Sequence, residues 1–321
     1  MLISEIKKEL EKYDRKELTN IIVELYKKIP KKKKEEHNID EFIKNMKTKE
    51  VNKNTHLTFD ELKTEILFFL DCVDNECYSR ENKVINKNER RNWRFKVKRY
   101  YKELNNILPS SSEGNTANEL LIEIFKRLSR GSNYLLFANW ETFRAVGISQ
   151  EEYYDVLMNR ILSNGYTKEN IENCIGLLDV PKDPTELSYD MFKKFAFNVN
   201  LINMNEIALE LLKEKVNVLE DSLKTTKNSH TRFELKEDIN DYIKCILEIY
   251  SNLKQYELGI KYFHKHYIED NKEVKEYILL DRLEKLELKD EWLKEYESNK
   301  GKVKYRDSIN EKYREFKSNN I

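Results

Sequence analysis

Large apolar residues recur along most of this sequence at intervals of three and four positions, which is the spacing of one face of an α-helix. The longest such face runs over about five turns and consists of Ile207, Ala208, Leu211, Leu212, Val216, Leu219 and Leu223. No segment alternates apolar and polar residues as a half-buried strand would. Only 7 Gly and 4 Pro interrupt 321 residues, and these two residue types are the main breakers of helices. The sequence therefore predicts an all-α, multi-helical fold with more than ~60% helix, against an average of ~30–35%.

Signals for helix starts agree with this periodicity. In a capping box, an Asp, Ser or Thr before the first turn and a Glu three residues later each accept a hydrogen bond from the other residue's backbone N–H. The chain has four such pairs at predicted helix starts: Asp14 with Glu17, Thr58 with Glu61, Ser149 with Glu152 and Thr231 with Glu234. We therefore expect helices to begin at these four positions.

Breaks in the pattern divide the chain into parts. Residues 47–57 show no periodicity, so they are predicted to be a linker that follows a short helix at 40–46. Residues 109–115, with the sequence Pro-Ser-Ser-Ser-Glu-Gly-Asn, form the clearest loop. We predict three helical units: an N-terminal unit with a basic helix (1–108), a central apolar unit (117–199) and a C-terminal unit of solenoid-like helical hairpins (203–321).

The least charged part of the chain is the segment 132–147 at the start of the central unit. Its large apolar residues are Leu135, Leu136, Phe137, Trp140 and Phe143. We expect these side chains to form the core of the central unit, because the rest of the chain is too charged to supply one. A ligand pocket or a partner-binding surface is the alternative interpretation.

Charge and cysteine content limit the partners and the compartment. The chain has 58 Lys and Arg and 58 Asp and Glu, so the net charge is zero and only a local patch can attract nucleic acid or an anionic membrane. The apolar runs are far shorter than the ~20 residues that span a bilayer, and the first residues lack an apolar core of signal-peptide length. Four scattered cysteines, Cys72, Cys77, Cys174 and Cys245, favour reduced thiols. We expect a cytoplasmic protein that does not contact a membrane, and the oligomeric state stays open.

No combination of residues predicts catalysis or a cofactor. The chain has no Gly-rich phosphate loop and no Gly-x-Ser-x-Gly nucleophile motif. His264 and His266 are two positions apart in a predicted helix, so their side chains point about 200° apart and cannot share a metal ion. Cys72 and Cys77 lack the second pair of ligands that a structural zinc site needs. We expect a non-enzymatic protein without catalytic residues, cofactor or bound transition metal.

Positive charge is concentrated at residues 87–102. On a helix, five basic residues of this segment fall on one side at spacings of 4, 3, 4 and 4, namely Lys87, Arg91, Arg94, Lys98 and Lys102. These five residues are called the basic row below. Such a row can contact the phosphates of a nucleic acid or the carboxylates of an acidic protein. The alternative is an ordinary amphipathic helix whose basic side is solvated or paired with acidic neighbours.

Residues 240–267 resemble one helical hairpin of the tetratricopeptide type. The residues that match the large and small positions of that pattern are Ile243, Ile246, Tyr250, Tyr256, Gly259 and Phe263. Leu247 and His266 replace small residues of the pattern, and its final Pro is missing. The match covers 28 of the 321 residues. The resemblance implies a solenoid-like helical part with a surface that binds another protein.

Gly259 is expected where the two helices of this hairpin approach most closely, opposite the face of Ile243 and Ile246. A glycine inside a helix costs about 0.5–1 kcal/mol relative to alanine, so its presence suggests a steric need. Leu at this position should overpack the crossing, whereas Ala should be neutral or mildly stabilising.

These features predict a protein-interaction or adaptor module of a bacterial-type cytoplasm, whose partner is another protein. The alternative is a nucleic-acid-associated helical protein that uses the basic row. The N-terminal hairpin looks similar to that of uncharacterised bacterial helical proteins, a resemblance that implies no activity.

Overall fold

The computed structural model describes residues 9–10, 12–36, 39–40, 58–82, 85–187 and 189–318. The linker predicted at 47–57 and nearly all of the short helix predicted at 40–46 lie outside the described residues. The structure is 74% helix, which confirms the all-α prediction, and its described residues contain no strand, only an isolated bridge between Lys300 and Val303. No described helix has the length and apolar composition that a membrane crossing requires.

The chain divides into two compact units, residues 1–58 and residues 59–321. The first unit contains α2 (Arg15–Lys28) and α3 (Lys31–Glu36), which are separated at Pro30. The predicted capping box at the start of α2 is confirmed. The Asp14 side chain accepts a hydrogen bond from the Glu17 N–H at 2.8 Å, and the Glu17 carboxylate accepts one from the Asp14 N–H at 2.9 Å.

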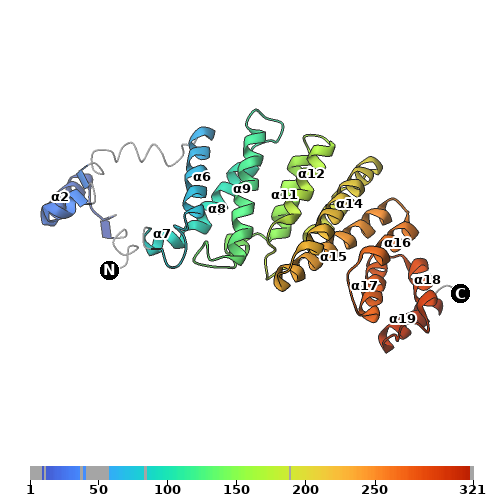
Figure 1. Ribbon diagram of the computed structural model, residues 1–321. Coiled ribbons are helices and arrows are strands. Elements are labelled where there is room, and N and C mark those ends of the chain that lie inside the picture. The colour runs from blue at the N-terminus through green and yellow to red at the C-terminus, as the bar shows by residue number, and fades with distance from the viewer. Residues whose placement is uncertain are drawn as a thin grey trace. The chain divides into compact units, whose positions relative to one another are not determined.

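The second unit is a succession of helices joined by turns. They are α6 (Phe59–Asp74), α7 (Lys87–Arg91), α8 (Trp93–Asn105), α9 (Gly114–Asn133), α10 (Thr142–Val146), α11 (Gln150–Leu162), α12 (Lys168–Gly176), the 3₁₀ turn η1 (Leu177–Asp179), α13 (Asp190–Asn198), α14 (Ile202–Thr225), α15 (Ser229–Asn252), α16 (Tyr256–His266), α17 (Lys272–Lys285), α18 (Lys289–Asn299) and α19 (Asp307–Ser318). Figure 1 shows the helices of this unit following one another in chain order, from α6 to α19.

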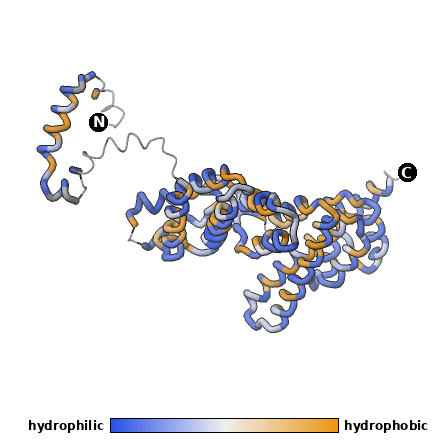
Figure 2. Tube along the Cα trace, turned by 90° about the horizontal axis from the view of Figure 1, so that it is seen from above, coloured by the Kyte–Doolittle hydropathy of each residue, from blue (hydrophilic) through white to orange (hydrophobic). Residues whose placement is uncertain are grey.

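Most helices of the second unit pack against partners that are near in the chain. α8 contacts α9 and α10, α9 contacts α11, α11 contacts α12 and α13, and α13 contacts α15. Further along, α14 and α15 form a long pair, α15 contacts α16, and α17, α18 and α19 pack in sequence. In Figure 2, hydrophobic and hydrophilic positions alternate along these helices, as expected of amphipathic helices that each bury one side. The division into three helical units, at 1–108, 117–199 and 203–321, stays a prediction.

The apolar face predicted for α8 lies in the core. Trp93, Val97, Tyr100 and Leu104 are each at most 2% exposed, and the Trp93 ring stacks on Phe137 with centroids 4.2 Å apart. Burial of a large apolar side chain contributes about 1.5–3 kcal/mol. These side chains therefore determine which side of α8 faces the solvent.

The core prediction for residues 132–147 is correct for three side chains and wrong for two. Leu136, Phe137 and Phe143 are buried, whereas Leu135 is 68% and Trp140 is 49% exposed. Leu135 and Trp140 lie between α9 and α10, outside both helices. Because neither residue is part of a helix, the spacing of apolar residues does not determine which way its side chain points.

Two more predicted helix starts agree with the structure. Ser149 caps α11 and forms the predicted capping box with Glu152. α6 begins at Phe59, directly after Thr58.

The helix start predicted at Thr231 is wrong. α15 begins at Ser229, and the Asn228 side chain caps it by accepting hydrogen bonds from the N–H groups of His230 and Thr231 at 2.9 and 3.2 Å. Asn is as good a capping residue as Ser and better than Thr. The earlier cap therefore prevails over the Thr231–Glu234 pair.

α15 and α16 form a helical hairpin over the region singled out in the sequence. The predicted packing residues are buried, with Ile243, Ile246 and Phe263 at 0% exposure and Tyr250 at 6%, while Tyr256 at the start of α16 is half-buried. α15 has 24 residues and α16 has 11, so the two helices of the hairpin are unequal in length. The tetratricopeptide-like character of this part stays a prediction.

Gly259 lies at a close approach of α15 and α16, but opposite residues other than the expected Ile243 and Ile246. A Cβ atom added to Gly259 would lie 2.9 Å from the Tyr250 Cβ and 3.1 Å from the Leu247 Cδ1. Gly259 lies in the first turn of α16. In an antiparallel hairpin that position packs beside the last turns of the preceding helix, which here contain Leu247 and Tyr250.

The structure also reverses the expectation that Ala is tolerated at position 259. The Tyr250 Cβ is attached to the backbone and cannot move away as the end of a flexible side chain can. Gly259→Ala should therefore destabilise the protein by about 1–3 kcal/mol, and Gly259→Leu by more. The free energy of unfolding from urea titration measures the effect.

Gly176, at the end of α12, provides the control. No heavy atom lies within 4 Å of a Cβ added there, so Gly176→Ala should be neutral or stabilise by up to about 1 kcal/mol. Equal stability of the two Ala variants would show that α16 does not pack on α15 as described.

Candidate binding surface

The basic row lies on the solvent side of α7 and α8. All five of its side chains are exposed. The row faces outward because the apolar face of α8, from Trp93 to Leu104, is held in the core. The single helix expected over 87–102 is divided at Asn92, so Lys87 and Arg91 lie on α7 and the other three members of the row on α8.

Other basic residues of the same segment have partners within the protein. The Arg90 Nη1 donates hydrogen bonds to the backbone carbonyls of Ser79 and Arg80 at 3.0 and 2.8 Å. The Arg99 Nη2 lies 2.5 Å from the Glu65 Oε1. By contrast, no ion pair within the described ranges joins a basic-row side chain to a carboxylate. Neutralisation of the row by acidic neighbours is therefore not observed.

Three cavities lie along the basic row on α7 and α8. The first has a volume of 270 Å³ and is lined by Lys87 and Arg91 of the row. The second has a volume of 280 Å³ and is lined by Arg91 and Arg94. The third has a volume of 640 Å³ and is lined by Lys98 and Lys102. The first two cavities share Arg91 and Ala138. Ala145 lines the second cavity, and the next residue, Val146, lines the third. Every member of the row therefore borders a recess in the surface.

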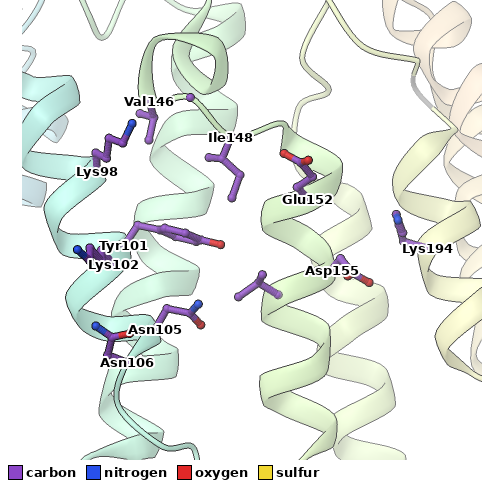
Figure 3. A pocket seen from close by; sticks show the side chains of 12 residues that line it. Lys98, Tyr101, Lys102, Asn105, Asn106, Val146, Ile148, Glu152, Asp155 and Lys194 are labelled. Carbon is purple, nitrogen blue, oxygen red and sulfur yellow. The ribbon is translucent and has the colours of Figure 1, made fainter.

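The third cavity lies between α8 and α11. Figure 3 shows Lys98, Tyr101 and Lys102 on the α8 side, and Glu152 and Asp155 on the opposite side from α11. The Tyr101 ring extends from α8 into the space between the two helices. The cavity therefore has the cationic groups of α8 on one wall and an aromatic ring in the middle, and its other wall carries the two carboxylates together with Lys194 of α13.

Neutral donors hold both of these carboxylates in place. Glu152 accepts a hydrogen bond from the Ser149 N–H at 3.0 Å, as part of the capping box of α11. Asp155 accepts one from the Asn198 Nδ2 at 2.8 Å. These bonds cancel no charge, and the Nζ of Lys194, the cation that lines this side of the cavity, lies 3.3 Å from the Glu151 Oε1 rather than in an ion pair with Glu152 or Asp155. The cavity can therefore bind a group that presents both an anion and a cation or N–H donor.

Comparison with protein families, with curated proteins and with solved structures found no match. The function of the basic row and its cavities therefore has to be argued from their own chemistry. The other candidate residues from the sequence, those of the α15–α16 hairpin, belong mainly to the core and shape no cavity with the row.

The structure also brings together three residues that the sequence analysis did not connect. His264 lies on α16, Glu276 on α17 and Glu295 on α18, and one potential ligand atom of each lies within 4.8 Å of the others. The His264 Nε2 lies 2.8 Å from the Glu295 Oε1. The Asn299 Nδ2 donates to the Glu276 Oε1 at 3.1 Å and to the Glu295 Oε1 at 2.6 Å. These four residues are called the C-terminal cluster below.

His266, two positions after His264, takes no part in this cluster. Its Nδ1 lies 2.8 Å from the Glu220 Oε1, so the two histidines bond to different helices. This agrees with the angular separation predicted from the helix geometry.

Burial and hydrogen bonding shift the pKa values of the C-terminal cluster in opposite directions. Burial and the charge of the neighbouring Glu295 raise the pKa of Glu276 to about 7. Burial alone would raise the pKa of Glu295, but the hydrogen bond and the charge of His264 outweigh it and lower that pKa. The hydrogen bond to Glu295 raises the pKa of His264, against the effect of burial.

One signal in the sequence marks this cluster. Glu276 precedes Leu279, Leu280 and Leu283 by 3, 4 and 7 positions, so an acidic residue occupies the apolar face of α17. Glu276 is only 4% exposed. An acid on a buried face requires a partner, but the sequence does not show which helix supplies it.

The contrast between Arg90 and Arg91 can be tested by their effects on stability. Arg90→Ala removes the donor to two carbonyls and should destabilise the protein by about 1–3 kcal/mol. Arg91→Ala removes the same charge from an exposed side chain and should change the stability by no more than about 0.5 kcal/mol. Chemical denaturation of both variants measures the difference, and equal effects would contradict the assigned contacts of Arg90.

Proposed function

We propose that this protein is a non-enzymatic interaction module that binds an acidic segment of another protein along the basic row. The observation that carries the proposal is the row itself: five exposed cations without ion-pair partners among the described residues border three cavities. Unpaired charges beside recesses attract a ligand of opposite charge and give it shape to fit against.

The length of the row suits an extended peptide. On α8, Arg94 and Lys102 are 8 positions apart, which corresponds to roughly 12 Å along the helix at ~1.5 Å per residue. An extended chain of about four residues covers that length at ~3.3 Å per residue. A somewhat longer acidic segment can also reach Lys87 and Arg91 on α7.

The third cavity favours a protein over a nucleic acid as the ligand. Glu152 and Asp155, on the wall opposite α8, repel the phosphates of a nucleic-acid strand that follows Lys98 and Lys102, and Lys194 on the same wall offsets part of this repulsion. A peptide segment avoids this repulsion, because its backbone N–H groups or a Lys side chain can face the carboxylates while its own acids face α8. Phe95, 59% exposed on α8, adds apolar contact surface beside the row.

The cysteines support a reducing compartment such as a bacterial-type cytoplasm. All four are free thiols, and Cys72, Cys174 and Cys245 are buried. The proposal includes no catalytic step, because the row and its cavities contain no nucleophile paired with a base.

Charge reversal in the row tests the proposal. The variant Arg91→Glu, Arg94→Glu and Lys98→Glu should weaken binding of a fluorescent, Glu-rich peptide of eight to ten residues by at least about tenfold, because three attractive contacts become repulsive. The wild-type affinity should fall as salt is added. Fluorescence anisotropy measures both effects.

A matched control variant, Lys227→Glu, Lys254→Glu and Lys261→Glu, changes the net charge equally at three exposed lysines outside the row. It should bind the peptide almost as the wild type does. Equal loss in both variants, or no binding by the wild type at low salt, would contradict the proposal. Tighter binding of single-stranded or duplex DNA than of the peptide, lost in the row variant alone, would support the nucleic-acid alternative instead.

A further inference from the structure

We propose that His264, Glu276 and Glu295 form a binding site for a divalent transition-metal ion such as Zn²⁺. The proposal concerns the opposite end of the second unit in chain order from the basic row and does not depend on the proposed function. It replaces the expectation from the sequence that the chain binds no transition metal. That expectation considered only ligands within one helix.

The ligand geometry is the first support. One imidazole nitrogen and two carboxylate oxygens lie within 4.8 Å of one another, and they come from three successive helices. Ligand atoms around a tetrahedral zinc ion are ~3.4 Å apart, given bonds of ~2.0–2.2 Å. Small side-chain movements therefore suffice to bring the three atoms into a coordination sphere. An ion bound here would replace the present contact between the His264 Nε2 and the Glu295 Oε1.

The charge of the site is the second support. Glu276 and Glu295 are 4% and 9% exposed, so two carboxyl groups share a site that is largely shielded from water. Adjacent buried carboxyl groups are stabilised either by a shared proton or by a positive charge. His264 supplies one positive charge, through its contact with Glu295. A divalent cation between the three ligands would compensate both carboxylates at once.

An unsatisfied hydroxyl group beside the carboxylates is an independent observation. The Tyr305 Oη is buried and has no hydrogen-bond partner among the described residues. The Tyr305 ring stacks on Tyr296, the residue after Glu295, with centroids 4.5 Å apart. Buried polar atoms are rarely left unpaired. A metal-bound water is one partner that would satisfy it.

Access and the remaining coordination position are provided by an adjoining cavity. It has a volume of 530 Å³ and is lined by His264, Glu276 and Asn299 of the cluster together with Lys272, Lys275 and Lys302. Lys275 donates to the backbone carbonyls of His264 and Tyr267, so its ammonium group already has two acceptors. An ion at the cluster would keep an open position for water or a small anion from this cavity.

The donor set indicates the class of metal. An imidazole nitrogen with carboxylate oxygens suits Zn²⁺ and related first-row ions, whereas Mg²⁺ prefers oxygen ligands alone in an octahedral arrangement. Because the ligands come from α16, α17 and α18, a bound ion would also connect these three helices. Zn²⁺ should therefore raise the melting temperature of the protein, and Mg²⁺ should not.

The test uses the full chain without a polyhistidine tag, after treatment with a chelator. Isothermal titration calorimetry with Zn²⁺ should give one binding site per chain, and thermal unfolding should show an increased melting temperature. Glu276→Gln keeps the size of the side chain and an oxygen that can accept from Asn299, so it should fold and bind Zn²⁺ at least about tenfold more weakly. His264→Ala should lose the site.

His266→Ala is the matched control, because it removes a histidine of the same helix that pairs with Glu220 instead. It should bind Zn²⁺ as the wild type does. The proposal is overturned if the wild type shows no stoichiometric binding, since the carboxyl groups then share a proton and no metal. It is equally overturned if Glu276→Gln and His264→Ala bind Zn²⁺ as tightly as the wild type.

Discussion

Burial of one apolar side of each helix against helices nearby in the chain is the interaction on which the rest of this structure depends. A 3.6-residue repeat places the apolar residues of α8 on a single side, and contact with α9 and α10 removes that side from water. Once Trp93 and Leu104 are buried, the rotation of α8 about its axis is determined. The direction of the basic row is a consequence of that rotation, so the binding surface is specified by residues that do not belong to it.

Features that lie within a single helix could be predicted from the sequence. The buried faces of α6, α8, α14 and α15 follow from apolar spacing alone, and the exposure of Arg94 follows from its position beside such a face. The cap at Ser149 could also be predicted, because both partners of its capping box lie in one helical turn. The start of α15 was predicted at the wrong residue, because the capping box at Thr231 and Glu234 fits the same apolar face as the cap at Asn228 that the structure contains.

Features that depend on the packing of separate helices could not be predicted. The sequence indicated a steric need at Gly259, but the identity of the opposing residues, Leu247 and Tyr250, depends on how far the α15–α16 turn offsets the two helices. The acidic wall of the third cavity comes from α11, about 50 positions beyond α8. The C-terminal cluster requires α16, α17 and α18 to be placed together in space, and apolar periodicity carries no information about which polar side chains then meet.

The packing of helices on near neighbours has a consequence for how the second unit folds and opens. When most contacts join segments that are close in the chain, contact order is low, loop closure costs little entropy and folding is fast. Stability in such an array is approximately a sum over neighbouring pairs, so helices at the ends open more readily than those in the middle. Several helix–helix interfaces thus lie between α7 and α8 at one end and α16 to α18 at the other. A local change in structure at one end can be accommodated by small shifts at these interfaces. The two ends of the array are therefore expected to be energetically independent, so that a change in structure at one end leaves the other unchanged.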